Sequence, residues 1–181
     1  MMRGNTLFGS LGFGAVCALG SIPWLMVTTP LFGRPWALAL YCLAAAVLYL
    51  VIIAPSAARS LAMGGLAGVL ALVVGLLAPW PPEAILGAVL IVAVVRSGFL
   101  YRSRPARALL LEGGLAIGGL VTAYALAGST LLGTALAIWS FFLVQSLFFL
   151  TGGVRERDAN ELQIDPFEQA RRKALALMEE V

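Results

Sequence analysis

Residues 35–53 read PWALALYCLAAAVLYLVII and contain no charged side chain. An α-helix needs about 20 such residues to cross the ~30 Å hydrocarbon core of a bilayer. The stretch lacks the alternation of apolar and polar residues that a barrel strand shows, and a helix satisfies its backbone hydrogen bonds internally. It therefore predicts a transmembrane helix.

The composition of the whole chain points the same way. The chain has 181 residues, of which 61% are hydrophobic and 12% are charged. Soluble domains carry about 25% charged residues, and a chain of this length cannot bury so much apolar surface in a core of its own. We therefore expect an all-α, polytopic membrane protein whose outer surface faces the lipid bilayer.

Five further apolar segments accompany the first, separated by short breaks rich in Pro and Gly that end one helix and start the next. Together they predict a six-helix transmembrane domain over residues 1–150, arranged as three helical hairpins. The predicted spans are 7–28, 35–53, 60–78, 82–101, 108–126 and 130–150. A polar linker over 151–164 and a short amphipathic cytoplasmic helix over 165–181 complete the predicted organisation.

The distribution of basic residues predicts the orientation. With the N-terminus in the cytoplasm, eleven of the twelve Lys and Arg residues lie on the cytoplasmic side, as the positive-inside rule requires. These eleven are Arg3, Arg59, Arg96, Arg102, Arg104, Arg107, Arg155, Arg157, Arg171, Arg172 and Lys173. Only Arg34 lies on the other side. We expect a multi-pass protein of the bacterial inner membrane with both termini in the cytoplasm.

Two ionisable residues, Arg96 and Glu112, fall inside predicted spans, where an ionised side chain costs at least about 2.5 kcal/mol. Each lies about 8–9 Å from the cytoplasmic edge on consecutive antiparallel helices, so an ion pair is expected. Tyr49 and Gln145 lie at a similar depth on two other helices. Two interpretations stay open for these four residues: a structural lock between helices, or a polar site for an ion or ligand that opens to the cytoplasm.

Small residues recur at a spacing of four on three of the predicted helices. Such spacings let two helix backbones approach closely in a membrane. The residues concerned are Gly64 and Gly68, Gly114 and Gly118, and Ser10 and Gly14. They predict either tight packing within the chain or the contact face of a homo-oligomer.

The C-terminal segment has the signals of a separate helix. Asp165, Pro166 and Glu168 suit its first turn. An apolar stripe follows at helical spacing, consisting of Phe167, Ala170, Ala174, Leu177 and Met178. Its polar face mixes acidic and basic residues, whereas a membrane-surface helix has a markedly basic one. We therefore expect this helix to dock onto a protein partner or onto the protein's own cytoplasmic face.

Motifs for catalysis, metal binding or cofactor binding are not found. The chain contains no His, which removes the commonest general base and metal ligand, and it has no P-loop, HExxH or GxSxG sequence. Cys17 and Cys42 lie in apolar runs without a CxxC partner and are interpreted as packing residues. No enzyme activity, metal, cofactor or nucleic-acid partner is expected.

These features favour a small non-catalytic protein that serves as an accessory or structural subunit of a larger membrane assembly. The alternative is a small transporter or substrate-binding membrane component with its polar site near the cytoplasmic leaflet. A lipid-active membrane enzyme would have to use Glu112 or Tyr49 as its acid–base group.

Overall fold

The described part of the chain is entirely helical. The computed structural model describes residues 7–54, 56–100, 105–128 and 130–147, which form six α-helices and no strand. They are α1 (Leu7–Phe32), α2 (Arg34–Ile53), α3 (Ala57–Leu77), α4 (Pro81–Leu100), α5 (Pro105–Leu126) and α6 (Leu131–Ser146). The prediction of an all-α chain is confirmed for these residues.

Four of the helices are long and apolar enough to cross a membrane. These segments are Gly9–Phe32, Arg34–Ile53, Ala57–Leu77 and Pro81–Phe99. The apolar portions found in α5 and α6, Leu110–Leu126 and Leu131–Ser146, are shorter. Leucines on the outer surface are strongly exposed, with Leu61 at 81% and Leu76 at 76%. Large apolar surfaces of this kind suit a chain surrounded by lipid.

Local sequence signals account for the helix boundaries. Gly33 adopts a positive φ of 74° between α1 and α2, a conformation that glycine reaches without steric cost. Ser56 caps α3 by accepting a hydrogen bond from the backbone N–H of Arg59, and Thr130 caps α6 by accepting one from Gly133. Pro81 stands at the first position of α4, where its missing N–H costs nothing.

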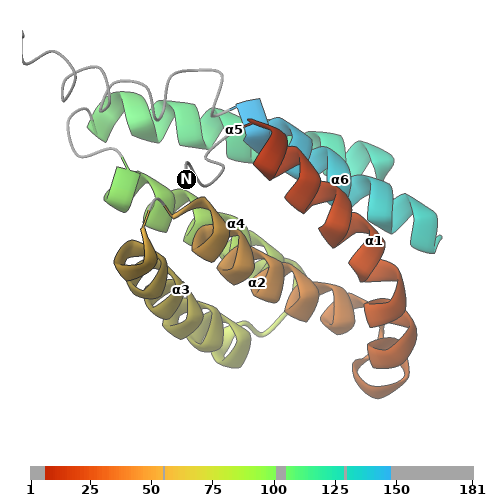
Figure 1. The fold of residues 1–181 in the computed structure, drawn as a ribbon. Coiled ribbons are helices and arrows are strands. Elements are labelled where there is room, and N and C mark those ends of the chain that lie inside the picture. Colours follow the sequence, from red (N-terminus) through yellow and green to blue (C-terminus); the bar gives the residue numbers. More distant parts are fainter. Residues whose placement is uncertain (1–6, 55, 101–104, 129, 148–181) are drawn as a thin grey trace, which may run out of the picture.

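Five helices form a ring and the sixth lies outside it. α2 packs against α1, α3 and α4, while α6 lies between α1 and α5, and a light contact between α4 and α5 closes the ring. α3 packs on the outside against α2 and α4, and only Met63 and Ala67 of α3 are buried. Figure 1 shows α1, α5 and α6 on one side and α2, α3 and α4 on the other.

α2 supplies much of the core, including the fully buried Tyr49 and Leu50. The first residues of α2, α4 and α6 meet at one end of the ring, where Arg34 hydrogen-bonds to the turn between α5 and α6. We call this the Arg34 end. The last turns of the same helices meet at the opposite end, which we call the Arg96 end.

Candidate functional site

A buried ion pair joins α4 to α5 at the Arg96 end. The Nε of Arg96 donates to Oε1 of Glu112 at 2.6 Å, and Nη2 donates to Oε2 of the same carboxylate. Arg96 is 0% exposed and Glu112 is 4% exposed. This two-point contact fixes the planes of both groups and is the stronger form of an arginine–carboxylate bond.

Gln145 of α6 and Tyr49 of α2 complete the arrangement. Arg96 Nη2 also donates to Oε1 of Gln145 at 2.7 Å, and Nη1 donates to the Tyr49 hydroxyl at 3.3 Å. The amide nitrogen of Gln145 donates to the backbone carbonyl of Leu115 on α5 at 3.3 Å. The structure thus brings together all four residues singled out in the sequence, and each comes from a different helix. We call Tyr49, Arg96, Glu112 and Gln145 the polar layer.

The polar layer is closed off from its surroundings. Its four side chains are all buried. Each buried charge would cost several kcal/mol if isolated, and the paired, hydrogen-bonded arrangement offsets that cost. Among the described residues, no three His, Cys, Asp or Glu lie close enough to hold a metal ion. The geometry therefore favours a structural lock between helices over an open polar ligand site.

Aromatic rings cover the polar layer on the side that faces the Arg34 end. Phe142 contacts Tyr49 with ring centroids 5.4 Å apart, and Phe13 of α1 contacts both rings at 5.1 Å and 5.6 Å. The edge-to-face geometry of Phe13 and Phe142 is a favourable one for aromatic pairs. This cluster separates the charges from the space beyond.

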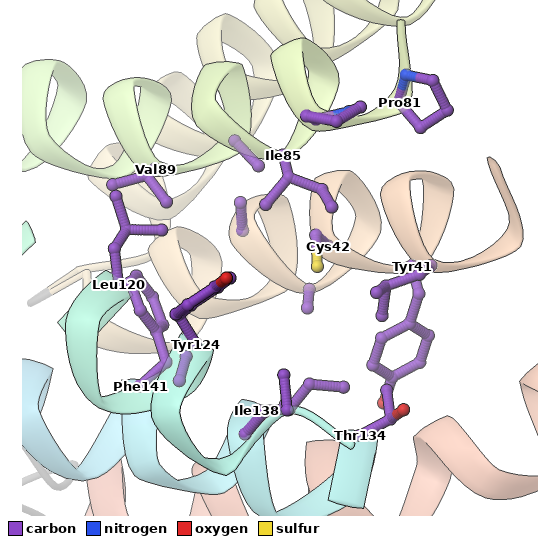
Figure 2. Close-up of a pocket in the computed structure, with 18 of the residues that line it drawn as sticks. Tyr41, Cys42, Pro81, Ile85, Val89, Leu120, Tyr124, Thr134, Ile138 and Phe141 are labelled. Atoms are coloured by element: carbon purple, nitrogen blue, oxygen red, sulfur yellow. The ribbon is translucent and has the colours of Figure 1, made fainter. Parts of the chain in front are cut away.

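That space is an apolar cavity of about 480 Å³ between helices of the ring, and it is partly open to the surroundings, because Tyr124 in its wall is 86% exposed. It is bounded by α2, α4, α5 and α6, and Figure 2 shows the side chains that line it. Those labelled there are Tyr41, Cys42, Pro81, Ile85, Val89, Leu120, Tyr124, Thr134, Ile138 and Phe141. Volumes of 300–1,000 Å³ with predominantly apolar walls are typical of sites for small molecules.

The cavity and the polar layer are stacked along the same helices. Ala46, Val92 and Phe142 line the cavity, and each stands one helical turn before a member of the polar layer. The cavity therefore runs from the Arg34 end to a floor just above the polar layer. Four helices build both features.

Sequence reasoning did not identify this cavity. A signal was present in the small residues Ala45, Ala46, Ala88 and Ala137, which face one another from three helices and leave the space between them unfilled. Of the two cysteines interpreted as packing residues, Cys17 is buried on α1, whereas Cys42 lines the cavity.

The small residues that recur at a spacing of four on three helices lie in different environments. A Cβ placed on Gly14 would lie 2.7 Å from Cβ of Phe142, and one on Gly64 would lie 2.6 Å from Cγ2 of Val51. Gly118 meets only ordinary contact, at 3.6 Å from Val144. Gly68 and Gly114 face open space, with nothing within 4 Å.

Two other small residues, Ser10 and Gly119, also lie at buried positions. Ser10 is buried, and its hydroxyl has no hydrogen-bond partner among the described residues. Gly119, which belongs to no predicted motif, is closely approached: a Cβ there would lie 2.8 Å from the ring of Phe141. Close approach is therefore decided by the facing side chain and not by the spacing of glycines.

The predicted C-terminal docking helix over 165–181 lies outside the described residues, as do its apolar positions. Its docking role stays a prediction.

Comparison of the chain with protein-family models, with curated proteins and with solved structures found no match.

Proposed function

We propose that this chain is a small, non-catalytic membrane protein that binds an apolar or amphipathic molecule inside its helical ring. The observation that carries the proposal is the 480 Å³ cavity, walled by apolar side chains of four helices and closed at one end by the aromatic cluster. Tyr124 belongs to the cavity wall and is 86% exposed, so the cavity is open to the surroundings and a molecule can enter it. Its volume and apolar walls match those of sites for small molecules.

The polar layer serves this function indirectly. All three nitrogens of the Arg96 guanidinium donate within the layer, and both oxygens of Glu112 accept. These bonds tie α4, α5, α6 and α2 together beneath the cavity, so they hold its floor in place. The sequence alternatively predicts a substrate-binding component with its site at the polar residues. We propose that the binding site is the cavity instead.

The proposed placement in the membrane follows from charge and length. All six helices are proposed to cross the bacterial inner membrane as three hairpins, with both termini in the cytoplasm. The support is the apolar character of the helices together with the distribution of Lys and Arg, eleven of which fall on one side. In this orientation the polar layer lies near the cytoplasmic leaflet and the Arg34 end faces outward.

Binding is tested with an uncharged fluorescent polyene alcohol and the purified full-length protein in detergent. Ile85 points into the cavity from α4, while its neighbour Leu86 is 50% exposed on the outside. Replacing Ile85 with Trp fills the cavity, so we expect affinity for the probe to fall by about tenfold or more, equivalent to at least about 1.4 kcal/mol. The matched change Leu86→Trp should leave the affinity at the wild-type value.

Cys42 provides an independent reading of where the probe binds. In the variant Cys17→Ser it is the only cysteine of the chain. Labelling of Cys42 by an apolar maleimide should slow as the alcohol is added, because the ligand covers the cavity wall. If Ile85→Trp and Leu86→Trp bind equally well, and Cys42 is not protected, the proposed function is wrong.

A second candidate function is that of an accessory subunit in a membrane assembly. α3 favours it, because this helix lies outside the ring and exposes Gly65, Leu61 and Leu72 along its length. In lipid, such a surface with small residues permits close contact with another helix. Isolation of the chain in mild detergent as a solitary monomer would contradict this candidate.

A further inference from the structure

Apolar walls alone give the cavity little selectivity inside a bilayer. Lipid tails are as apolar as leucine, so a hydrocarbon chain gains little by moving from the bilayer into an apolar cavity. Burial drives binding strongly only when the ligand comes from water. Which molecule occupies the cavity is therefore decided by polar groups at its wall.

One charged side chain belongs to that wall among the described residues, namely Arg34 at the start of α2. Its Nη2 donates to Oγ1 of Thr134 at 2.9 Å and to the carbonyls of Thr130 at 3.1 Å and Gly128 at 3.2 Å. These bonds bridge α2 to the turn before α6 and hold the guanidinium at the cavity wall. A charge held in place in this way loses little side-chain entropy when a ligand arrives.

Several helix ends lie beside Arg34, and three of the four are N-terminal ends. α2, α4 and α6 all begin at this end, and Pro35, Pro81 and Thr134 from their first turns line the cavity. The N-terminal end of each of these helices carries about half a positive charge, whereas the C-terminal end of α5, followed by Ala127 and Gly128 in the cavity wall, carries about half a negative charge. The acidic residue of the first turn of α4, Glu83, is exposed and does not line the cavity.

The cavity therefore has two chemically distinct ends. Figure 2 shows Pro81, Tyr41 and Thr134 towards one end, and Val89, Leu120 and Phe141 towards the other. Thr134 of the first group is hydrogen-bonded to Arg34, whereas the second group consists of apolar side chains without charge. An apolar chain fits the second end, and an anion fits the Arg34 end.

Accepting that the cavity is a binding site, as proposed above, we infer that its ligand is an anionic amphiphile. One hydrocarbon chain would lie along the cavity with its tip towards Phe142, and a carboxylate or phosphate group would meet Arg34 at the opposite end. Free fatty acids and anionic phospholipids share this chemistry, because each carries a hydrocarbon chain beside an acidic oxygen group.

The test compares two fluorescent polyene probes that have the same chain, one ending in a carboxylate and one in an alcohol. Hydrogen bonds to a charged group are stronger than neutral ones. We therefore expect wild-type protein in detergent to bind the carboxylate at least about tenfold more tightly. In Arg34→Gln the two probes should bind equally, whereas the control Arg59→Gln, at the start of α3, should keep the wild-type preference.

Arg34 also links two helices, so the folding of Arg34→Gln is checked by its thermal unfolding. The variant Arg34→Lys keeps the charge and should retain most of the preference. If Arg34→Gln does not fold, wild type and Arg34→Lys still decide the matter, since equal binding of the two probes by wild type overturns the inference. Retained preference in a folded Arg34→Gln also overturns it.

The outcome that contradicts the proposed function itself is a different one. If replacing Ile85 with Trp weakens the binding of neither probe, then neither probe occupies the cavity.

The source of the ligand is identified by competition against the bound carboxylate probe. Displacement by unlabelled fatty acid but not by nanodiscs rich in phosphatidylglycerol assigns a free fatty acid. Displacement by phosphatidylglycerol but not by phosphatidylcholine assigns an anionic lipid. Failure of every anionic competitor to displace the probe contradicts the inference.

Discussion

The two ends of the helical ring are built by the same helices in opposite ways. At the Arg96 end, long polar side chains reach across the ring and are hydrogen-bonded to Arg96. Towards the Arg34 end, alanines such as Ala46 and Ala88 face one another across an apolar cavity. One end is packed and polar, and the other is unfilled and apolar.

The difference reflects what holds helices together in lipid. Apolar side chains interact about as well with lipid as with one another, so an apolar contact alone gives a weak preference for one arrangement of helices. A buried charge, in contrast, strongly destabilises any arrangement in which it lacks its partner. The polar layer therefore ties four helices together at one end of the ring, whereas the other end is left unfilled.

We expect the largest loss of stability from breaking the ion pair at the Arg96 end. Replacing Glu112 with Gln leaves Arg96 buried without its counter-charge, which should lower the free energy of unfolding by about 3–5 kcal/mol. The measurement is equilibrium unfolding of the full chain in mixed micelles. Replacing both members, with Arg96→Met and Glu112→Leu, should cost less than either single change, because no charge then stays buried.

The exposed Glu83 serves as the control for this prediction. Glu83→Gln removes a carboxylate from the first turn of α4 and should change stability by less than about 1 kcal/mol. Equal effects of the two substitutions would show that the polar layer contributes nothing beyond an ordinary surface charge.

The next largest effect is a difference in the loss of stability between alanine substitutions of two isoleucines in α4. Ile91 of α4 is 4% exposed within the packed core, and its replacement by Ala should cost about 2–5 kcal/mol. Ile85 borders the cavity, so its side chain already lacks neighbours on one side and Ile85→Ala should cost less than about 2 kcal/mol. Both are measured in delipidated detergent solution. Equal costs would mean that the cavity wall is packed as tightly as the core.

The smallest effect concerns two glycines that the sequence does not distinguish. Gly14→Ala places a Cβ 2.7 Å from Cβ of Phe142, next to the backbone of α6, and should destabilise the ring by about 1–3 kcal/mol. Gly114→Ala meets nothing within 4 Å and should stabilise α5 by up to about 1 kcal/mol. Thermal unfolding of the two variants should therefore shift in opposite directions.

The polar layer was largely predictable because the height of a residue along a helix can be read from its position in the sequence. Arg96 and Glu112 lie at matching distances from the facing ends of consecutive helices, and a charge in an apolar segment needs a partner. The contact of Arg96 with Gln145, and of Gln145 with the carbonyl of Leu115, depends on which helices are neighbours. Sequence order does not give that information.

The sequence alone determined that the chain is helical and strongly apolar, and how far along their helices its two buried charges stand, because hydropathy and helix rise are local properties. Tertiary structure alone decided that five helices close into a ring, that Gly14 packs tightly while Gly114 stays open, and that alanines from three helices leave a cavity. Each of these depends on which helix faces which. A void is a property of the surrounding side chains together, so no single segment of the sequence encodes it.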